Sequence, residues 1–239
     1  MLCRSEERAA EARVRLVKMG CDATRLIFEK CDLASFASVR ACVKRLQAAE
    51  SRIDILVNNA GIIPPQSFAA DEGRIVNVSS LLHKMSGHFD PVEIDTKENY
   101  IERSFAWYSV CALLGLCEPY NRSKLANVMH SRELTRRLRS EGNSSVSINS
   151  LHPGVCLTEI GRNLPALSNP VSRALGNALM KTERDGAQTS LFLALSPSVR
   201  AVSGCYFSDC ARSPEHQDAL DDLAAARLFD YSLGAVGLA

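Results

Sequence analysis

An excess of charge of either sign is absent from this sequence. Its 28 Lys and Arg residues are balanced by 27 Asp and Glu, so the formal net charge is only +1. A near-neutral chain has no basic field with which to attract nucleic acid. The arginines between Arg132 and Arg139 are therefore more typical of a solvated helix face than of a polyanion-binding patch.

Long hydrophobic runs are missing as well. The most apolar short stretch, Val110–Leu116, is far shorter than the ~20 residues that cross a membrane. The first residues, Met1–Glu7, are not typical of a signal peptide or an anchor. We therefore expect no membrane span and a cytoplasmic location. Without repeats or low-complexity linkers, the 239 residues predict one domain, over residues 1–239.

Metal-ligand spacing is also absent among the cysteines. The sequence has nine of them, but they form no Cys-x-x-Cys pair and no cluster with histidine. An odd number scattered among apolar segments predicts reduced, buried thiols. We expect neither a metal site nor a disulfide framework.

What the sequence does contain is an alternation of two periodicities. Short β-branched runs typical of buried parallel strands alternate with amphipathic stretches typical of helices. This order predicts an α/β fold with a doubly wound parallel sheet. The expected strands are 25–31, 53–57, 74–78, 146–151 and 204–207, and the expected helices are 5–19, one capped by Ser35 with Phe36, Val39, Val43 and Leu46 on one face, 120–140, one from Thr182 to Leu195, and 218–229.

Tyr120 and Lys124 are the most informative pair of residues. Four residues apart on a helix, their side chains share one face. A free tyrosine titrates near ~10, and a fixed ammonium beside it favours the phenolate, which suits a general acid/base acting on an alcohol oxygen. On its own this spacing is common by chance, and an interfacial tyrosine beside a surface lysine is the alternative.

Three other motifs end predicted strands, where open α/β sheets bind their ligands. Small and amide residues let a backbone approach a ligand closely, and a serine can donate a hydrogen bond to a substrate oxygen. Ordinary strand-ending turns are the alternative for each motif. The motifs are Asn58-Asn59-Ala60-Gly61, Ser79-Ser80, and Pro153-Gly154-Val155 with Thr158.

Together these motifs resemble the short-chain dehydrogenase/reductase family, in the order in which that family carries them. The matching motifs are Asp32-Leu33, Asn58-Asn59-Ala60-Gly61, Ser79-Ser80, Tyr120-x-x-x-Lys124 and His152-Pro153-Gly154. The phrases Ser123–Val128, Gly186–Thr189 and Tyr206–Cys210 are similar to its retinol dehydrogenase-like branch. The resemblance covers nearly the whole chain and implies a Rossmann-type oxidoreductase that uses NAD(P).

The resemblance also implies a role for each matching residue. Tyr120 would be the catalytic acid/base, Lys124 would bind the nicotinamide ribose and tune Tyr120, and Ser80 would polarise the substrate oxygen. The other cofactor-binding residues would be Asp32 and Leu33 at the adenine, Asn59, Ala60 and Gly61 beside the adenosine ribose, and Pro153, Val155 and Thr158 at the carboxamide.

Arg4 bears on the choice of cofactor. It matches the position just past the second strand that, in this branch, meets a 2′-phosphate. A guanidinium fits a phosphate better than a ribose hydroxyl, so NADP(H) is expected rather than NAD(H). The alternative is a solvated residue near the chain terminus.

The sequence departs from the family pattern in three places. It has no Gly-rich turn for the pyrophosphate, so we expect a sheet that lacks its first strand. Only 12 residues separate Gly61 from Arg74, about the minimum for a parallel crossover. Neither the family's usual crossover helix nor its catalytic Asn is visible there. The run 104–119 looks inserted. A spliced or otherwise truncated form of a longer enzyme would explain all three.

Two functions follow as expectations. The first is an NADP(H)-dependent oxidoreductase that interconverts a hydrophobic, retinol-like alcohol and its aldehyde or ketone. The alternative is a catalytically silent chain that acts, if at all, by association, since the helix of Tyr120 also forms a dimer interface in the family. We expect a small-molecule substrate, no nucleic acid and a possible homodimer. Longer relatives are expected at the endoplasmic reticulum membrane.

Overall fold

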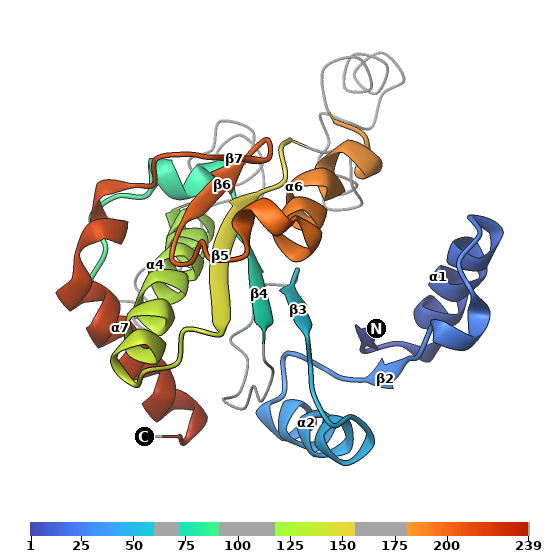
Figure 1. Ribbon diagram of the computed structural model, residues 1–239. Helices are drawn as coiled ribbons and strands as arrows, with labels where there is room; N and C mark the ends of the chain where they lie inside the picture. The colour runs from blue at the N-terminus through green and yellow to red at the C-terminus, as the bar shows by residue number, and fades with distance from the viewer. Residues whose placement is uncertain (60–71, 91–117, 156–180, 239) are drawn as a thin grey trace, which may run out of the picture. The chain divides into compact units, whose positions relative to one another are not determined.

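A computed structural model describes residues 1–59, 72–90, 118–155 and 181–238. The chain divides into two compact units. Among the described residues, the first unit holds 1–53 and the second holds the remainder (Figure 1). That the whole chain is one domain stays a prediction.

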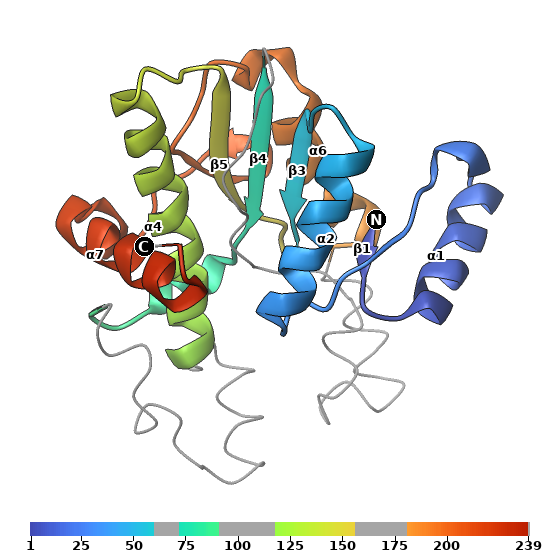
Figure 2. The same cartoon turned by 90° about the horizontal axis from the view of Figure 1, so that it is seen from below.

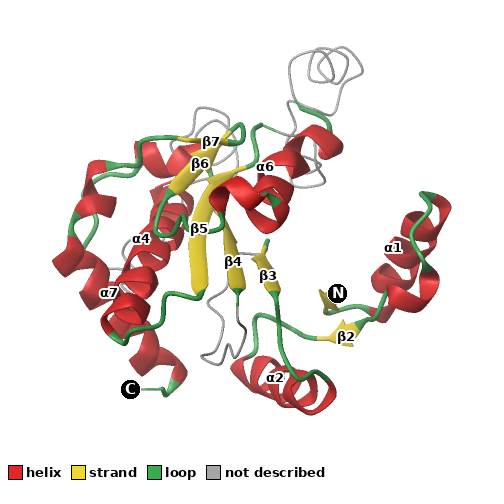
Figure 3. Ribbon diagram, in the orientation of Figure 1, coloured by secondary structure: helices red, strands yellow, loops and turns green. Residues whose placement is uncertain are grey.

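The first unit pairs two short strands and two helices (Figure 3). Strand β1 (Leu2–Cys3) runs parallel to β2 (Glu29–Lys30). Helix α1 (Glu6–Lys18) follows β1, and α2 (Phe36–Ala49) follows β2. Both helices begin at a serine, Ser5 and Ser35, whose hydroxyl accepts a backbone N–H of the first turn. The two predicted helices are confirmed.

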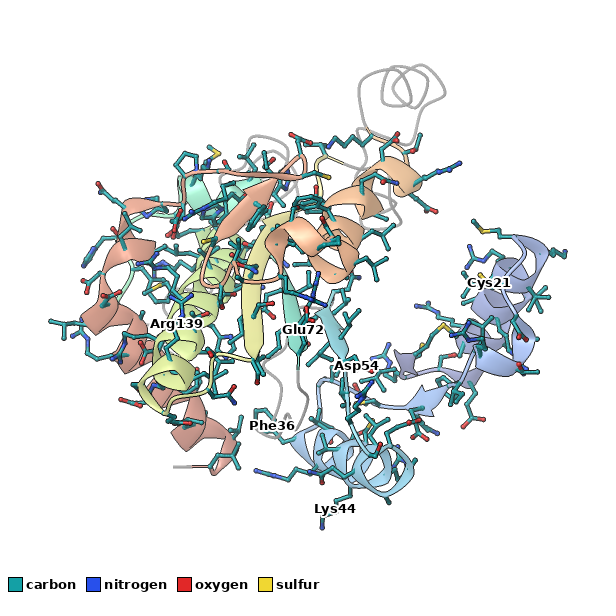
Figure 4. All side chains as sticks on the ribbon, in the orientation of Figure 1. Cys21, Phe36, Lys44, Asp54, Glu72 and Arg139 are labelled. Carbon is teal, nitrogen blue, oxygen red and sulfur yellow. The ribbon has the colours of Figure 1, made fainter. Side chains whose placement is uncertain are left out.

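Two details of this unit differ from prediction. The strand expected over 25–31 is confirmed only at 29–30, because the Asp22 carboxylate accepts the Thr24 N–H and starts a 3-10 turn at Ala23–Arg25. In α2, Phe36 is 52% exposed (Figure 4), and the one buried residue of the helix is Cys42.

The second unit is built on a five-stranded sheet in the order β3-β4-β5-β6-β7. The first four strands are parallel and β7 is antiparallel to β6. Every residue of β4 and β5 is buried, as expected for strands covered on both faces. The strands are β3 (Ile55–Asn58), β4 (Gly73–Val78), β5 (Val146–His152), β6 (Tyr206–Ser208) and β7 (Ala211–Arg212).

Helices cover both faces of this sheet (Figure 2). On one face, α4 (Glu118–Ser140) and α7 (Asp222–Val236) pack together, and on the other lies α6 (Glu183–Leu195). Alternation along β6 shows the two layers. Tyr206 belongs to the α4 and α7 core, while its neighbour Phe207 belongs to the core beneath α6. This is the doubly wound α/β architecture predicted from the sequence.

The ends of the helices agree with prediction in α6 and differ in α7. Thr182 caps α6 as expected, accepting the Asp185 N–H at 3.1 Å. The closing helix, expected over 218–229, begins only at Asp222. The preceding residues 217–220 form a 3-10 turn, and the Asp221 carboxylate then accepts two backbone N–H groups at the start of α7.

Each unit has its own strand pairing. In the described part of the chain, β2 pairs with β1, whereas β3 pairs with β4, and the two pairs belong to different sheets. Strand β3 is an edge strand, and its Ile55 and Val57 side chains are 38% and 43% exposed. The short connection after Gly61 and the insertion over 104–119 fall largely outside the described residues.

Two absences and one correction concern other sequence expectations. Over the described ranges, no helix is long and apolar enough to cross a membrane, and no cluster of three or more His, Cys, Asp or Glu could hold a metal. Six cysteines are described and all are free. Cys31 and Cys42 are buried as predicted, but Cys21 is exposed, so the expectation of buried thiols is wrong there.

Candidate active site

Helix α4 presents Tyr120 and Lys124 on one face, as their spacing predicts. The Lys124 ammonium lies 5.5 Å from the centre of the Tyr120 ring. It also donates to the Val78 carbonyl at 3.3 Å, at the end of β4. Burial lowers the pKa of Lys124. Tyr120 is 42% exposed.

The two serines after β4 have different partners. Ser79 donates its hydroxyl proton to the Lys124 carbonyl at 2.7 Å, which fastens the strand end to α4. The Ser80 oxygen accepts the Leu82 N–H at 3.2 Å and caps the 3-10 turn η2 (Leu81–Met85). The hydroxyl of Ser79 is thus committed to the helix. That of Ser80 can accept this bond and still donate its proton to a ligand.

A chain of amide side chains holds the neighbouring strand ends and α4 together. Asn58 of β3 donates to the Asn77 side-chain oxygen at 2.7 Å, and Asn77 of β4 donates to the Ser131 hydroxyl at 2.9 Å. Asn77 and Ser131 are buried. Asn127 donates to the same Val78 carbonyl as Lys124. The sequence analysis does not predict this network. The feature that could have indicated it is the pair of amide residues, Asn58 and Asn77, inside otherwise apolar strands.

The turn after β5 has the close backbone approach that its glycine predicts. Gly154 has φ +98°, and a Cβ there would lie 2.5 Å from Cδ of Lys181. The Val155 carbonyl accepts the Lys181 N–H at 2.9 Å, and the Lys181 ammonium pairs with the Asp209 carboxylate. Val155 itself is 60% exposed. Pro153 leads into this turn, and Thr158 lies outside the described residues.

The remaining predicted cofactor residues follow β1, β2 and β3. Arg4 is exposed directly after β1, and Asp32 and Leu33 are half-buried after β2. Because β1 and β2 are parallel, Arg4 and Asp32 lie at the carboxyl ends of neighbouring strands. Arg4, Asp32 and Leu33 belong to the first unit. Ser80, Tyr120 and Lys124 belong to the second. Asn59 is exposed after β3, and Ala60 and Gly61 lie outside the described residues.

Comparison with known proteins gives the family. A family profile described as short chain dehydrogenase matches residues 1–72. Retinol dehydrogenase 14 of Mus musculus is 34% identical over 278 residues, which cover 100% of this chain and 78% of that protein. The human protein of that name is 36% identical, over 89% of this chain and 67% of its own length. The chain belongs to the short-chain dehydrogenase/reductase family. Within it, the chain falls in the retinol dehydrogenase-like branch, and by family it is an oxidoreductase.

Solved structures show the same fold for this short-chain dehydrogenase/reductase. An uncharacterised protein from Mycobacterium paratuberculosis has a TM-score of 0.61 at 19% identity, covering 99% of this chain and 83% of its own. A gluconate 5-dehydrogenase from Burkholderia cenocepacia, solved with NADP and tartrate, has a TM-score of 0.56 at 20% identity, covering 87% and 81%. At these identities the likeness concerns the fold alone.

Proposed function

We propose that this protein is an NADP(H)-dependent oxidoreductase that interconverts a hydrophobic, retinol-like alcohol and its aldehyde or ketone. The observation that carries the proposal is the group at the end of β4. There, an exposed Tyr120 faces the Lys124 ammonium, and Lys124 and Ser79 bind the strand end that carries Ser80. The retinol dehydrogenase names of the relatives support the class of substrate.

The residues of the group have complementary tasks in reduction of a carbonyl. Ser80 donates a hydrogen bond to the substrate oxygen, and Tyr120 gives that oxygen a proton. Lys124, partly withdrawn from water, stabilises the negative charge that develops on the phenol oxygen as the proton leaves. In alcohol oxidation the same proton moves in the reverse direction. NADP(H), when bound, gives or takes the hydride.

Each unit by itself offers residues that support such a cofactor. The Lys124 ammonium would meet the nicotinamide ribose, and the Gly154 turn, with Pro153, Val155 and Thr158, would meet the carboxamide. By the family resemblance, Asp32 and Leu33 of the first unit would meet the adenine. Asn59 of the second unit, together with Ala60 and Gly61 outside the described residues, would meet the adenosine ribose. Arg4 is an exposed cation at the carboxyl end of β1, where it would meet a 2′-phosphate.

The test is reduction of retinaldehyde and simpler hydrophobic aldehydes by NADPH, followed by loss of NADPH absorbance. Tyr120→Phe should lower kcat by about a hundredfold or more, because it removes the proton donor. Tyr231→Phe, which removes a phenol hydroxyl from α7, is the matched control and should keep full activity. Equal activity of the Tyr120→Phe variant and the wild type would refute the assignment.

The cofactor choice has its own test. Arg4→Ser should raise KM for NADPH about tenfold and leave KM for NADH nearly unchanged, because a bidentate phosphate contact is lost. Arg8→Ser, which removes an exposed arginine of α1, controls for the loss of charge. A wild type that prefers NADH would show that Arg4 has no such role.

A catalytically silent chain is the second candidate function. It is favoured by the lack of any Gly-rich turn for a pyrophosphate in the 239 residues. Such a chain would act, if at all, by association. It would show neither NADPH-dependent stabilisation nor turnover, and this separates it from the first candidate.

A further inference from the structure

The peptide bond between Ser80 and Leu81 is held at both ends by histidines. The Ser80 carbonyl lies 2.7 Å from Nδ1 of His83, within η2. The Leu81 N–H donates to Nδ1 of His152, the last residue of β5, at 3.1 Å. One histidine comes from the turn itself. The other comes from a strand 71 residues further along the chain.

These contacts fix the state of both rings. A carbonyl can only accept, so Nδ1 of His83 carries the proton, and its Nε2 accepts the His216 N–H at 3.3 Å. In His152, Nδ1 accepts from Leu81 and therefore carries none. His83 is therefore neutral, and both of its ring nitrogens are hydrogen-bonded. In His152, a proton on Nδ1 would place two donors against each other, because the Leu81 N–H already points at that nitrogen.

The surroundings of the two rings favour neutrality. His83 is 0% exposed, and burial lowers its pKa to about 4. The charges of Lys84, His216 and His152 lower this pKa further, and the Tyr206 ring lies 4.5 Å from the His83 ring. His152 is 8% exposed, and burial lowers its pKa although Asp209 opposes this, with Lys181 and Lys84 adding to the lowering.

His152 connects two parts of the site. His152 directly precedes the Pro153–Val155 turn, so its ring ties that turn to the turn carrying Ser80. Ser80 is 9% exposed, and its hydroxyl oxygen already accepts the Leu82 N–H. Fixing the Ser80–Leu81 peptide fixes the backbone from which the Ser80 side chain projects, and the hydrogen bond from the Leu82 N–H then holds its Oγ.

We propose that His83 and His152 are positioning residues, which fix the Ser80–Leu81 peptide and thereby aim the Ser80 hydroxyl at the substrate oxygen. This inference rests on the proposed function, because it assigns Ser80 to the carbonyl. Neither histidine exchanges a proton with the substrate. Each acts through the backbone of Ser80.

Asparagine provides a sharp test, because its side-chain amide places a donor or acceptor near the position of histidine Nδ1. His83→Leu and His152→Leu remove the hydrogen bond, whereas His83→Asn and His152→Asn can restore it. We expect each Leu variant to lower kcat for aldehyde reduction at least tenfold with KM for NADPH within twofold. Each Asn variant should recover most of that loss. His130→Phe, which changes a buried histidine of α4, is the control and should leave kcat unchanged.

A second measurement needs no turnover. Hydrogen exchange of the Leu81 amide, followed by NMR, should be at least tenfold faster in His152→Leu than in wild type, and near wild type in His152→Asn. Asn variants no better than Leu variants in kcat, or a Leu81 amide indifferent to His152, would overturn the inference. If wild type reduces no aldehyde, the proposed function fails and the role in catalysis fails with it. The exchange rates then still show whether the two-histidine contact exists.

Discussion

Stability should fall steeply as the pH drops from 7 to 5, and His130 should account for a definable part of the fall. His130 lies in α4, 6% exposed, with its ring stacked on Phe229 at 5.4 Å. Burial lowers its pKa to about 4, whereas an unfolded histidine titrates near ~6.5. The unfolded chain therefore takes up a proton that the folded chain resists. The resulting stability is complete above pH ~6.5 and is lost as the pH falls toward 4.

The magnitude follows from linkage. Between pH 7 and pH 5, a pKa that differs by about 2.5 units between the two states lowers the free energy of unfolding by about 2 kcal/mol. His130→Phe keeps an aromatic ring against Phe229 and removes the titration. The variant should therefore lose about 2 kcal/mol less than wild type over this interval.

Urea unfolding at both pH values, followed by circular dichroism, measures the difference. A His130→Phe variant that loses as much stability as wild type would refute the reasoning.

Three further predictions concern stability at neutral pH, each measured by chemical or thermal unfolding. Glu133 is 2% exposed and accepts hydrogen bonds from two arginines, so Glu133→Ala should cost about 3 kcal/mol. Arg136→Ala, which removes the more exposed of the two arginines, should cost much less. A Glu133→Ala variant as stable as Arg136→Ala would contradict this. Gly154→Ala should cost about 1–2 kcal/mol, because its φ is +98° and its Cβ would displace the Lys181 side chain. Unchanged stability would show that the turn can adjust. Leu125→Ala, at 0% exposure in the α4 core, should cost about 2–5 kcal/mol, and a loss below about 1 kcal/mol would mean that the core is not packed as described.

The sequence predicts the parts of the site that local geometry determines. Tyr120 and Lys124 share a face because four residues make about one helical turn, whatever the rest of the chain does. The turn at Gly154 follows from a Pro-Gly pair that ends a strand. Ser79 and Ser80 end a β-branched run, although the sequence alone does not show which of the two hydroxyls bonds the helix.

The parts that escaped prediction depend on contacts between distant segments. The sequence marks His152 only as the first residue of a motif, because its hydrogen-bond partner, Leu81, lies 71 residues away in sequence. The Asn58 and Asn77 pair forms only once β3 and β4 stand side by side. Hydrophobic periodicity carries no information on such polar pairing, nor on the Asp22 side chain that shortens β2.

The central claim is that this chain binds NADPH and uses Tyr120 to transfer a proton. The most direct measurement is thermal unfolding of the purified chain with and without NADPH. A nucleotide that binds only the folded form adds about 2.7 kcal/mol at a hundredfold excess over Kd, a rise in Tm of roughly 5–10 °C for a protein of this size. The account predicts such a rise with NADPH and a smaller one with NADH. A cooperative transition that NADPH leaves unmoved would contradict it and identify a chain that keeps the residues of a short-chain dehydrogenase/reductase without its activity.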